Sequence, residues 1–158
     1  MPQSQVTVRV QRPTAVVFDC IARHSWTNDP AWEPEVLSVR PDGDGLRVGG
    51  RVAMTRRESG KVVTTTYEIT ALEPPHRLAF AHIDGPMQFA LDFLVSPAGA
   101  EEADVTVTVN IRLRGAMRLL TPLFAIVGPS RNARISAQMV AAIEAATAAT
   151  GGVAAASA

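Results

Sequence analysis

The chain has 158 residues, of which 47% are hydrophobic and 19% charged, and its 15 basic side chains balance 15 acidic ones. This length suits one domain with a full hydrophobic core, and the composition excludes a disordered or supercharged chain. The balanced charge gives no sign of a nucleic-acid partner.

The single cysteine, Cys20, excludes an internal disulfide framework and a cysteine-based metal cluster. We therefore expect an inert, packed thiol in a reducing compartment, with the cytoplasm as the location. The N-terminus lacks the basic start and apolar stretch of a signal peptide, and no stretch approaches the roughly 20 apolar residues of a membrane span. The sequence thus predicts a soluble protein without a transmembrane segment.

The first predicted elements are a strand and a helix. Alternating valines at positions 6, 8 and 10 indicate a half-buried strand. From Thr14 the apolar residues follow a helical spacing, and Pro13 is tolerated at the start of such a helix. Residues 24–32 (HSWTNDPAW) combine turn formers with two tryptophans, which predicts a short, irregular second helix ending near Pro30 or Pro34.

Six further strand candidates follow at nearly regular spacing. They are separated by turn residues and span residues 35–40, 51–58, 62–73, 77–83, 87–95 and 103–113. Short turns between consecutive strands favour antiparallel pairing. The last two candidates are the clearest, because apolar and polar residues alternate along both.

After Gly115 the spacing becomes helical again, with an apolar stripe that continues to Ala146. Gly128 and Pro129 interrupt the stripe, and proline cannot donate a backbone hydrogen bond, so we expect a kink or a break near residues 126–130. The Ala-, Gly- and Ser-rich residues 150–158 predict a disordered tail. No repeat or linker divides the rest, which predicts one domain over residues 1–149.

We expect the sheet to wrap around residues 130–147 of this helix. The expected contact cluster consists of Phe89, Phe93, Val105, Val107, Val109, Ile135, Met139 and Ile143.

This order of elements resembles the helix-grip fold of the START-related superfamily (SRPBCC), in particular its polyketide cyclase/dehydrase and lipid-transport branch. The resemblance covers about residues 5–147 and rests on the element order together with the strings RPTAVVFDCIA, DPAWEPEVLSVR, VGGRVAMTRR and YEITALEPPHRLAF. It implies an α+β fold in which a curved antiparallel sheet of about seven strands wraps around a long C-terminal helix, with two short helices after the first strand. It also implies a cavity between sheet and helix, while the function inherits the breadth of the superfamily.

No motif of a common catalytic or cofactor site is present. The sequence lacks a nucleophile elbow, a phosphate loop, an HExxH zinc motif and a dinucleotide-binding glycine pattern. The three histidines, His24, His76 and His82, show no metal-ligand spacing. We therefore expect no metal and no cofactor, and any catalysis has to come from dispersed residues of the pocket.

Strand parity selects the residues that face such a pocket, because side chains two positions apart share one face of a strand. The residues selected in this way are Val52, Met54, Arg56, Glu58, Val63, Thr65, Tyr67, Ile69, Ala71, Leu78, Phe80 and His82. A β-bulge would shift the choice by one position and bring in Arg57 in place of Arg56. A buried arginine needs an acidic partner, a wet cavity, or an anionic or carbonyl-bearing ligand.

Three of these residues are candidates for chemistry. Arg56 is the fixed cation for a carboxylate or a developing enolate, Tyr67 the neutral donor and His82 the proton acceptor near neutral pH. Each also has a structural interpretation, as a surface arginine, a core aromatic and an exposed histidine. Two tryptophans, Trp26 and Trp32, either cap the core or contact a ligand at the cavity mouth.

The full set of expected ligand-binding residues is Trp26, Trp32, Met54, Arg56, Thr65, Tyr67, Phe80, His82, Met87, Phe89, Leu120, Phe124 and Met139. We expect a ligand to enter between residues 26–32 and the Gly128-Pro129 interruption, where regular hydrogen bonding is sparse.

Three classes of function remain open. The first is binding or carriage of a hydrophobic small molecule, such as a lipid, a polyketide or an aromatic metabolite. The second, implied by the resemblance, is a polyketide aromatase/cyclase whose polar groups promote enolisation and loss of water. No tryptophan lies between positions 33 and 158, which departs from the tryptophan- and arginine-rich strand of the aromatases. The third is a protein-interaction or stress-response module.

Five arginines occur without an acidic residue between them, at positions 112, 114, 118, 131 and 134. This strip favours a solvated helix face, with docking to an anionic membrane or an acidic partner as the alternative. The sequence leaves the oligomeric state open.

Overall fold

Seven antiparallel strands form one sheet in the order β1-β7-β6-β5-β4-β3-β2. The computed structural model describes the backbone of residues 3–156 and the side chains of residues 3–148. The strands are β1 (Gln3–Val10), β2 (Val36–Pro41), β3 (Arg51–Glu58), β4 (Lys61–Glu73), β5 (Arg77–His82), β6 (Met87–Gly99) and β7 (Glu102–Leu113). Every strand that the alternation predicts is present, which confirms the fold class.

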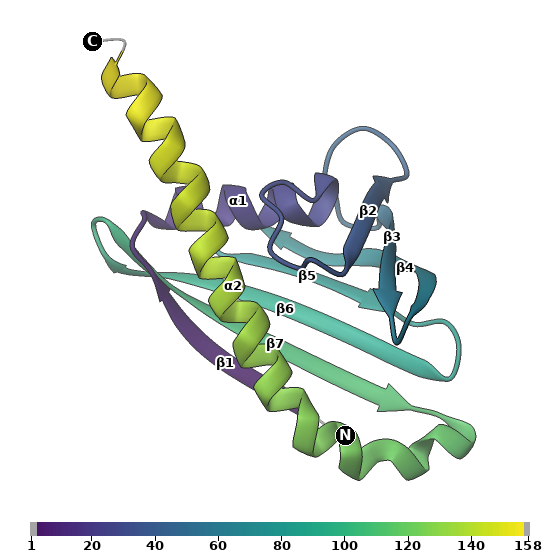
Figure 1. The fold of residues 1–158 in the computed structure, drawn as a ribbon. Helices are drawn as coiled ribbons and strands as arrows, with labels where there is room; N and C mark the ends of the chain where they lie inside the picture. Colours follow the sequence, from purple (N-terminus) through teal and green to yellow (C-terminus); the bar gives the residue numbers. More distant parts are fainter. Residues whose placement is uncertain (1–2, 157–158) are drawn as a thin grey trace.

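Within residues 3–156, three helical elements accompany the sheet: α1 (Thr14–Thr27), the 3-10 helix η1 (Gly115–Leu120) and α2 (Thr121–Ala156). Figure 1 shows α2 crossing one face of the curved sheet, with α1 near one end of the same face. α2 contacts β1 and β7, whereas α1 contacts β2, β6 and β7. The middle strands β4 to β6 therefore face α2 across a space. The candidate site described below lies in this space.

The segment around the two tryptophans forms no helix of its own. α1 continues to Thr27, where Asn28 adopts a left-handed conformation (φ 62°) and donates its backbone N–H to the carbonyl of His24. Residues 28–35 contain no helix, because the left-handed cap ends α1 and Pro30 and Pro34 lack a backbone N–H. The expected second helix is thus replaced by the last turn of α1 and a loop.

α2 continues through Pro129 without a break. In Figure 1, η1 and the green N-terminal part of α2 turn away from the axis of the rest of the helix, as a proline inside a helix predicts. The backbone remains helical to Ala156, past the expected domain boundary at residue 149. That boundary stays a prediction, because the side chains beyond residue 148 lie outside the described residues.

The core lies where α1 and the middle of α2 meet the sheet. Val17, Ile21, Val105, Met139 and Ile143 are at most 1% exposed and belong to one cluster. Phe93 and Val107 belong to the same cluster, and Val109 and Ile135 pack against it, as expected. Phe89 departs from the expectation, because it lies outside this cluster and contributes only to the cavity wall. Among the described residues, no helix is both long and apolar enough to cross a bilayer.

Candidate ligand-binding cavity

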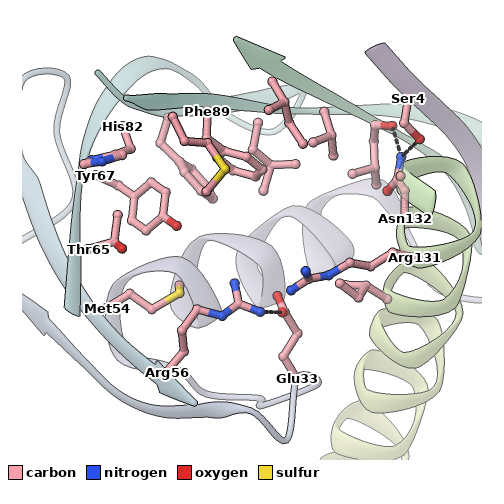
Figure 2. Close-up of a pocket in the computed structure, with 18 of the residues that line it drawn as sticks. Ser4, Glu33, Met54, Arg56, Thr65, Tyr67, His82, Phe89, Arg131 and Asn132 are labelled. Carbon is pink, nitrogen blue, oxygen red and sulfur yellow. Dashed lines mark hydrogen bonds and ion pairs between the residues drawn. The ribbon is translucent and has the colours of Figure 1, made fainter. Parts of the chain in front are cut away.

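A cavity of about 860 Å³ lies between the sheet and α2, a size typical of small-molecule sites. Its wall is mostly apolar. The large apolar side chains that β3 to β7 and α2 contribute include Val52, Met54, Val63, Ile69, Phe80, Met87, Phe89, Leu91, Phe93, Val107, Val109, Ile111, Leu123, Phe124, Val127, Ile135 and Met139. Figure 2 shows how the polar side chains are distributed around this wall.

Most of the residues expected in a site line this cavity. They are Trp32, Met54, Arg56, Thr65, Tyr67, Phe80, His82, Met87, Phe89, Phe124 and Met139. Two expected residues do not line it. Trp26 is buried in the core, with its ring near Gly50, because it lies in the last turn of α1 and not in the loop. Leu120, at the end of η1, is 43% exposed and does not belong to the cavity wall.

Strand parity places Arg56, and not Arg57, on the cavity side. Arg56 pairs in register with Val63 of β4, and its side chain is 12% exposed. A register shift does occur, but farther along, between Ile69 and Ala71. There it displaces Ala71 from the inward face, and Leu72, opposite Leu78, packs against the core instead. The expected inward position of Ala71 is therefore wrong, whereas the expected inward positions on β3 are correct.

Arg56 is held by two carboxylates. Its Nη2 donates a hydrogen bond of 3.1 Å to Oε2 of Glu33, whose side chain is 14% exposed, and Figure 2 shows this pair on the cavity wall. Its Nε lies 3.1 Å from Oε1 of Glu58, without hydrogen-bond alignment. Glu33 comes from the loop after α1, so no strand pattern could reveal it. Arg56 therefore has the acidic partners that its burial requires.

Acidic and basic groups both lie around the cavity, with one more carboxylate than guanidinium group. Three carboxylates, of Glu33, Glu58 and Asp84, and two guanidinium groups, of Arg56 and Arg131, belong to its wall. A carboxylate on a ligand would be repelled by these three acidic groups, and Arg56 is already paired with two of them, Glu33 and Glu58. Arg131 is exposed and has no ion pair among the described residues. A neutral group with oxygen atoms suits this wall better than an anion.

Tyr67 supplies a neutral hydroxyl to the same end of the cavity. Burial raises the pKa of its phenol, and the nearby Arg56 opposes this rise. The hydroxyl therefore remains protonated near neutral pH and can donate a hydrogen bond. Edge-on contacts with Phe80 (5.7 Å between ring centroids), His82 (6.0 Å) and Phe89 (6.0 Å) hold the ring in place.

Two imidazoles line the cavity. Nδ1 of His82 lies 2.9 Å from the carbonyl oxygen of Thr66, which in the neutral ring puts the proton on Nδ1 and leaves Nε2 as the acceptor. His24 has the same arrangement, with Nδ1 2.7 Å from the carbonyl oxygen of Pro30. Burial lowers the pKa of His24 to about 4, although the bond to Pro30 opposes this shift. Its ring is therefore neutral near pH 7.

His24 was not among the expected site residues, although a signal for it exists. It follows Cys20 and Ile21 at helical spacing on the inward face of α1. Its ring stacks on Trp32, with ring centroids 3.3 Å apart and planes inclined by 18°.

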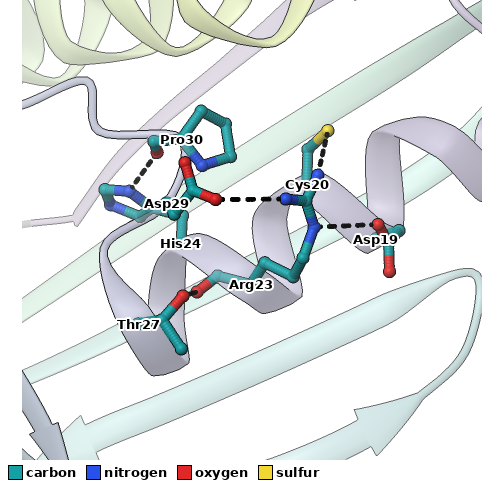
Figure 3. Close-up of polar contacts among 7 residues, drawn as sticks. All are labelled: Asp19, Cys20, Arg23, His24, Thr27, Asp29 and Pro30. Carbon is teal, nitrogen blue, oxygen red and sulfur yellow. Dashed lines mark hydrogen bonds and ion pairs between the residues drawn. The ribbon is translucent and has the colours of Figure 1, made fainter. Parts of the chain in front are cut away.

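The loop that carries Trp32 and Glu33 is tied to α1 by Arg23. Figure 3 shows Arg23 between Asp19 of α1, at 3.0 Å, and Asp29 of the loop, at 3.3 Å. The same guanidinium lies 3.7 Å from Sγ of Cys20, where Nη2 donates a weak hydrogen bond. Burial raises the pKa of the Cys20 thiol, with Arg23 opposing the rise, which favours an inert, packed cysteine.

A second polar group of the wall was also missed by parity. It consists of Ser4 of β1 with Asn132 and Ser136 of α2, which are 8%, 6% and 2% exposed. Asn132 joins the two serines by hydrogen bonds. Within the described residues, no cluster of His, Cys, Asp or Glu could hold a metal ion.

A curved antiparallel sheet that grips a long C-terminal helix and encloses an apolar cavity is the helix-grip fold of the START-related superfamily. The chain belongs to the family described as "Polyketide cyclase / dehydrase and lipid transport", which matches residues 1–150. A comparison with curated proteins finds no match.

Several solved structures share the fold. A START superfamily protein from Mycobacterium smegmatis is 11% identical with a TM-score of 0.74, over 90% of this chain and 97% of that one. The protein TTHA0849 from Thermus thermophilus is 17% identical with a TM-score of 0.73, over 92% and 99%. The Zhui aromatase/cyclase from Streptomyces sp. R1128 is 17% identical with a TM-score of 0.66, over 90% and 91%. At these identities the likeness concerns the fold.

Proposed function

We propose that the protein binds and carries a hydrophobic small molecule that is electrically neutral and bears oxygen, such as a lipid, a polyketide or an aromatic metabolite. The observation that supports the proposal most is the apolar cavity of about 860 Å³ with its charge-compensated polar end. An apolar wall alone would leave each ligand oxygen without a hydrogen bond, at a cost of about 1–3 kcal/mol. In this proposal, Tyr67 and the Arg56–Glu33 pair offset that cost by forming hydrogen bonds with the ligand oxygen.

Two measurements test this proposal. Native mass spectrometry of freshly purified protein should show a co-purified neutral ligand or, if the protein is empty, binding of the neutral fluorescent probe N-phenyl-1-naphthylamine. The variant Val109→Trp places a large side chain inside the cavity and should weaken probe binding at least about tenfold. Leu37→Trp is the matched control, because Leu37 is an exposed strand residue outside the cavity. If both variants bind the probe as wild type does, the cavity is not the binding site.

A polyketide aromatase/cyclase is the second candidate, favoured by two imidazoles, of His24 and His82, near a hydrogen-bond donor in one cavity. His24 or His82 would accept a proton from the carbon beside a ketone, and Tyr67 and Arg56 would stabilise the enolate oxygen. Loss of water from the cyclised intermediate would then give the aromatic ring. The name of the family and the aromatase/cyclase among the similar folds support this candidate, whereas the lack of tryptophan after position 32 counts against it.

The two candidates differ in what the histidines do. With a short poly-β-ketone as the probe, His82→Ala and His24→Ala should abolish turnover in an enzyme while the probe still binds. Unchanged binding together with no turnover in wild type or either variant favours a carrier. His76→Ala is the control, because His76 is not part of the cavity wall.

Other expectations rest on sequence alone. The cytoplasmic location rests on the single cysteine, and the lack of a nucleic-acid partner on the balanced charge. The interaction or stress-response module stays a third prediction, and no specific contact in the structure favours it.

A further inference from the structure

The cavity has a second polar region, formed by Ser4, Asn132 and Ser136, which we call the Asn132 cluster. Figure 2 shows Ser4 and Asn132 on the opposite side of the cavity from Tyr67 and Arg56. The apolar side chains of β6, β7 and α2 complete the wall. A molecule that fills the cavity therefore meets polar groups at two separate places.

The hydrogen bonds within the Asn132 cluster leave two positions open. Nδ2 of Asn132 donates to Oγ of Ser4 (3.0 Å) and to the carbonyl oxygen of Val107 (3.3 Å), which uses both of its hydrogens. Oδ1 of Asn132 accepts from Oγ of Ser136 at 3.4 Å, which leaves one lone pair. The hydroxyl hydrogen of Ser4 has no acceptor among the described residues. One donor and one acceptor thus remain at one point of the wall.

We propose that the Asn132 cluster is a hydroxyl-binding subsite. A hydroxyl group accepts and donates at once, so it can use both the Ser4 hydrogen and the Asn132 oxygen, whereas a carbonyl can use only the first. Together with Tyr67 and Arg56, the subsite selects elongated, neutral, hydrophobic molecules that carry an oxygen at each end. This inference rests on the proposed function and names its ligand class.

Alkanols and α,ω-alkanediols of matched chain length test the subsite. Each series, from about eight to about sixteen carbons, is titrated into protein loaded with N-phenyl-1-naphthylamine, and displacement of this probe measures the affinity. An alkanol can turn round and use whichever polar end remains, but a diol needs both. We therefore expect Ser4→Ala, Ser136→Ala and Tyr67→Phe each to weaken the best diol by about tenfold, or about 1.4 kcal/mol, and the alkanol by less than about twofold.

Ser130→Ala is the matched control, because Ser130 lies on the same helix but is exposed and outside the cavity wall. Thermal unfolding of each variant checks the fold, and the two serine variants test the subsite independently. The inference is overturned if the ratio of diol to alkanol affinity is the same in wild type and in both serine variants at every chain length. If neither series displaces the probe from wild type, the proposed function itself fails.

A second, independent observation concerns the outer surface at η1 and the start of α2. Residues 105–143 contain five arginines and no acidic residue, in a chain of zero net charge. Four large apolar side chains of the same segment are more than half exposed: Leu119 (82%), Leu123 (55%), Ile126 (76%) and Val127 (51%). We call these four residues with Arg114 and Arg118 the η1 surface. Figure 1 shows the backbone of η1 and the start of α2, which carry this surface, at the edge of the molecule beyond the end of β7.

We infer that the η1 surface docks on an anionic lipid bilayer. Exposed aliphatic side chains beside arginines match the acyl chains and anionic headgroups of such a surface. Leu123 and Val127 also belong to the cavity wall, so docking would bring the cavity to the lipid. This inference does not depend on what the cavity holds.

Co-sedimentation with vesicles tests the docking. Wild type should bind vesicles of phosphatidylcholine with about one-third phosphatidylglycerol, and added salt should release it from them. It should not bind vesicles of pure phosphatidylcholine. Leu119→Ser/Ile126→Ser and Arg114→Gln/Arg118→Gln should each lower binding at least about tenfold. Leu37→Ser/Val62→Ser, two exposed apolar residues on the sheet, is the control. Equal loss in the control, no preference for anionic vesicles, or a wild-type dimer that Leu119→Ser/Ile126→Ser dissociates would overturn the inference.

Discussion

The two halves of α2 have similar apolar side chains but different surroundings. In the second half, Met139 and Ile143 are at most 1% exposed and pack against the sheet. In the first half, Ile126 and Leu123 are more than half exposed. Helical periodicity predicts both halves equally well, because it depends on the spacing of apolar residues along the chain. Whether those residues become buried depends on what lies opposite.

The largest expected effect separates the halves directly. Ile143→Ala removes a fully buried side chain and should lower the free energy of unfolding by about 2–5 kcal/mol, through lost burial and the cavity left behind. Ile126→Ala, the same change in the exposed half, should alter it by less than about 0.5 kcal/mol. Urea unfolding of both variants measures the difference. Similar losses would mean that the first half is packed in solution.

A smaller effect arises where the packed region meets the cavity, at His24. The unfolded chain takes up a proton near the usual imidazole pKa of about 6.5, but the folded protein does so only near the lowered pKa of about 4. The unfolded state therefore binds more protons between these values, and stability falls as the pH drops through this window. Between pH 7 and pH 4.5 the loss from His24 should be about 2 kcal/mol.

Urea unfolding at several pH values measures this dependence. His24→Phe keeps an aromatic ring on Trp32 but cannot be protonated, so its stability should fall less between pH 7 and pH 4.5. His76→Phe is the control and should keep the wild-type dependence. An unchanged slope in His24→Phe would contradict the assignment.

The polar end of the cavity gives the third prediction. Arg56→Ala should weaken a neutral aromatic ketone such as 2-acetylnaphthalene by at least about tenfold, or about 1.4 kcal/mol, and leave naphthalene nearly unchanged. Arg57→Ala, one position along β3 and on the outer face, should change neither. Calorimetric titration measures both affinities. Wild-type ketone affinity in Arg56→Ala would show that Arg56 does not contact the ligand oxygen.

The sheet could be predicted from sequence because the alternation of apolar and polar residues is a local property of each strand. The same rule placed Arg56, Tyr67 and His82 on the cavity wall. It failed at Ala71, where a register shift that leaves no local signal moves Leu72 inward.

The residues that complete the site were beyond this rule. Glu33 reaches Arg56 from a loop, and Asn132 reaches Ser4 across 128 positions of the chain. Such contacts depend on how helices and loops lie over the sheet, which no local pattern specifies. Trp26 shows the opposite error. We expected it beside the cavity, but it lies in the last turn of α1 and is buried in the core.

The smallest expected effect concerns how a ligand reaches the cavity between these regions. Trp32 and Glu33 of the loop after α1, and Gly128 and Pro129 of the first half of α2, belong to the cavity wall. The loop lacks regular hydrogen bonds, and Pro129 removes one from α2, so both segments should open at lower cost than β6 and β7. Amide hydrogen exchange should therefore be faster in residues 28–35 and 126–130 than in the two strands.

Saturation with N-phenyl-1-naphthylamine should slow this exchange by about threefold in these two segments only, because a bound molecule favours the closed state. Equal protection of loop and strands, or slowing confined to the turn at Asp84 and Gly85, would place the entrance elsewhere.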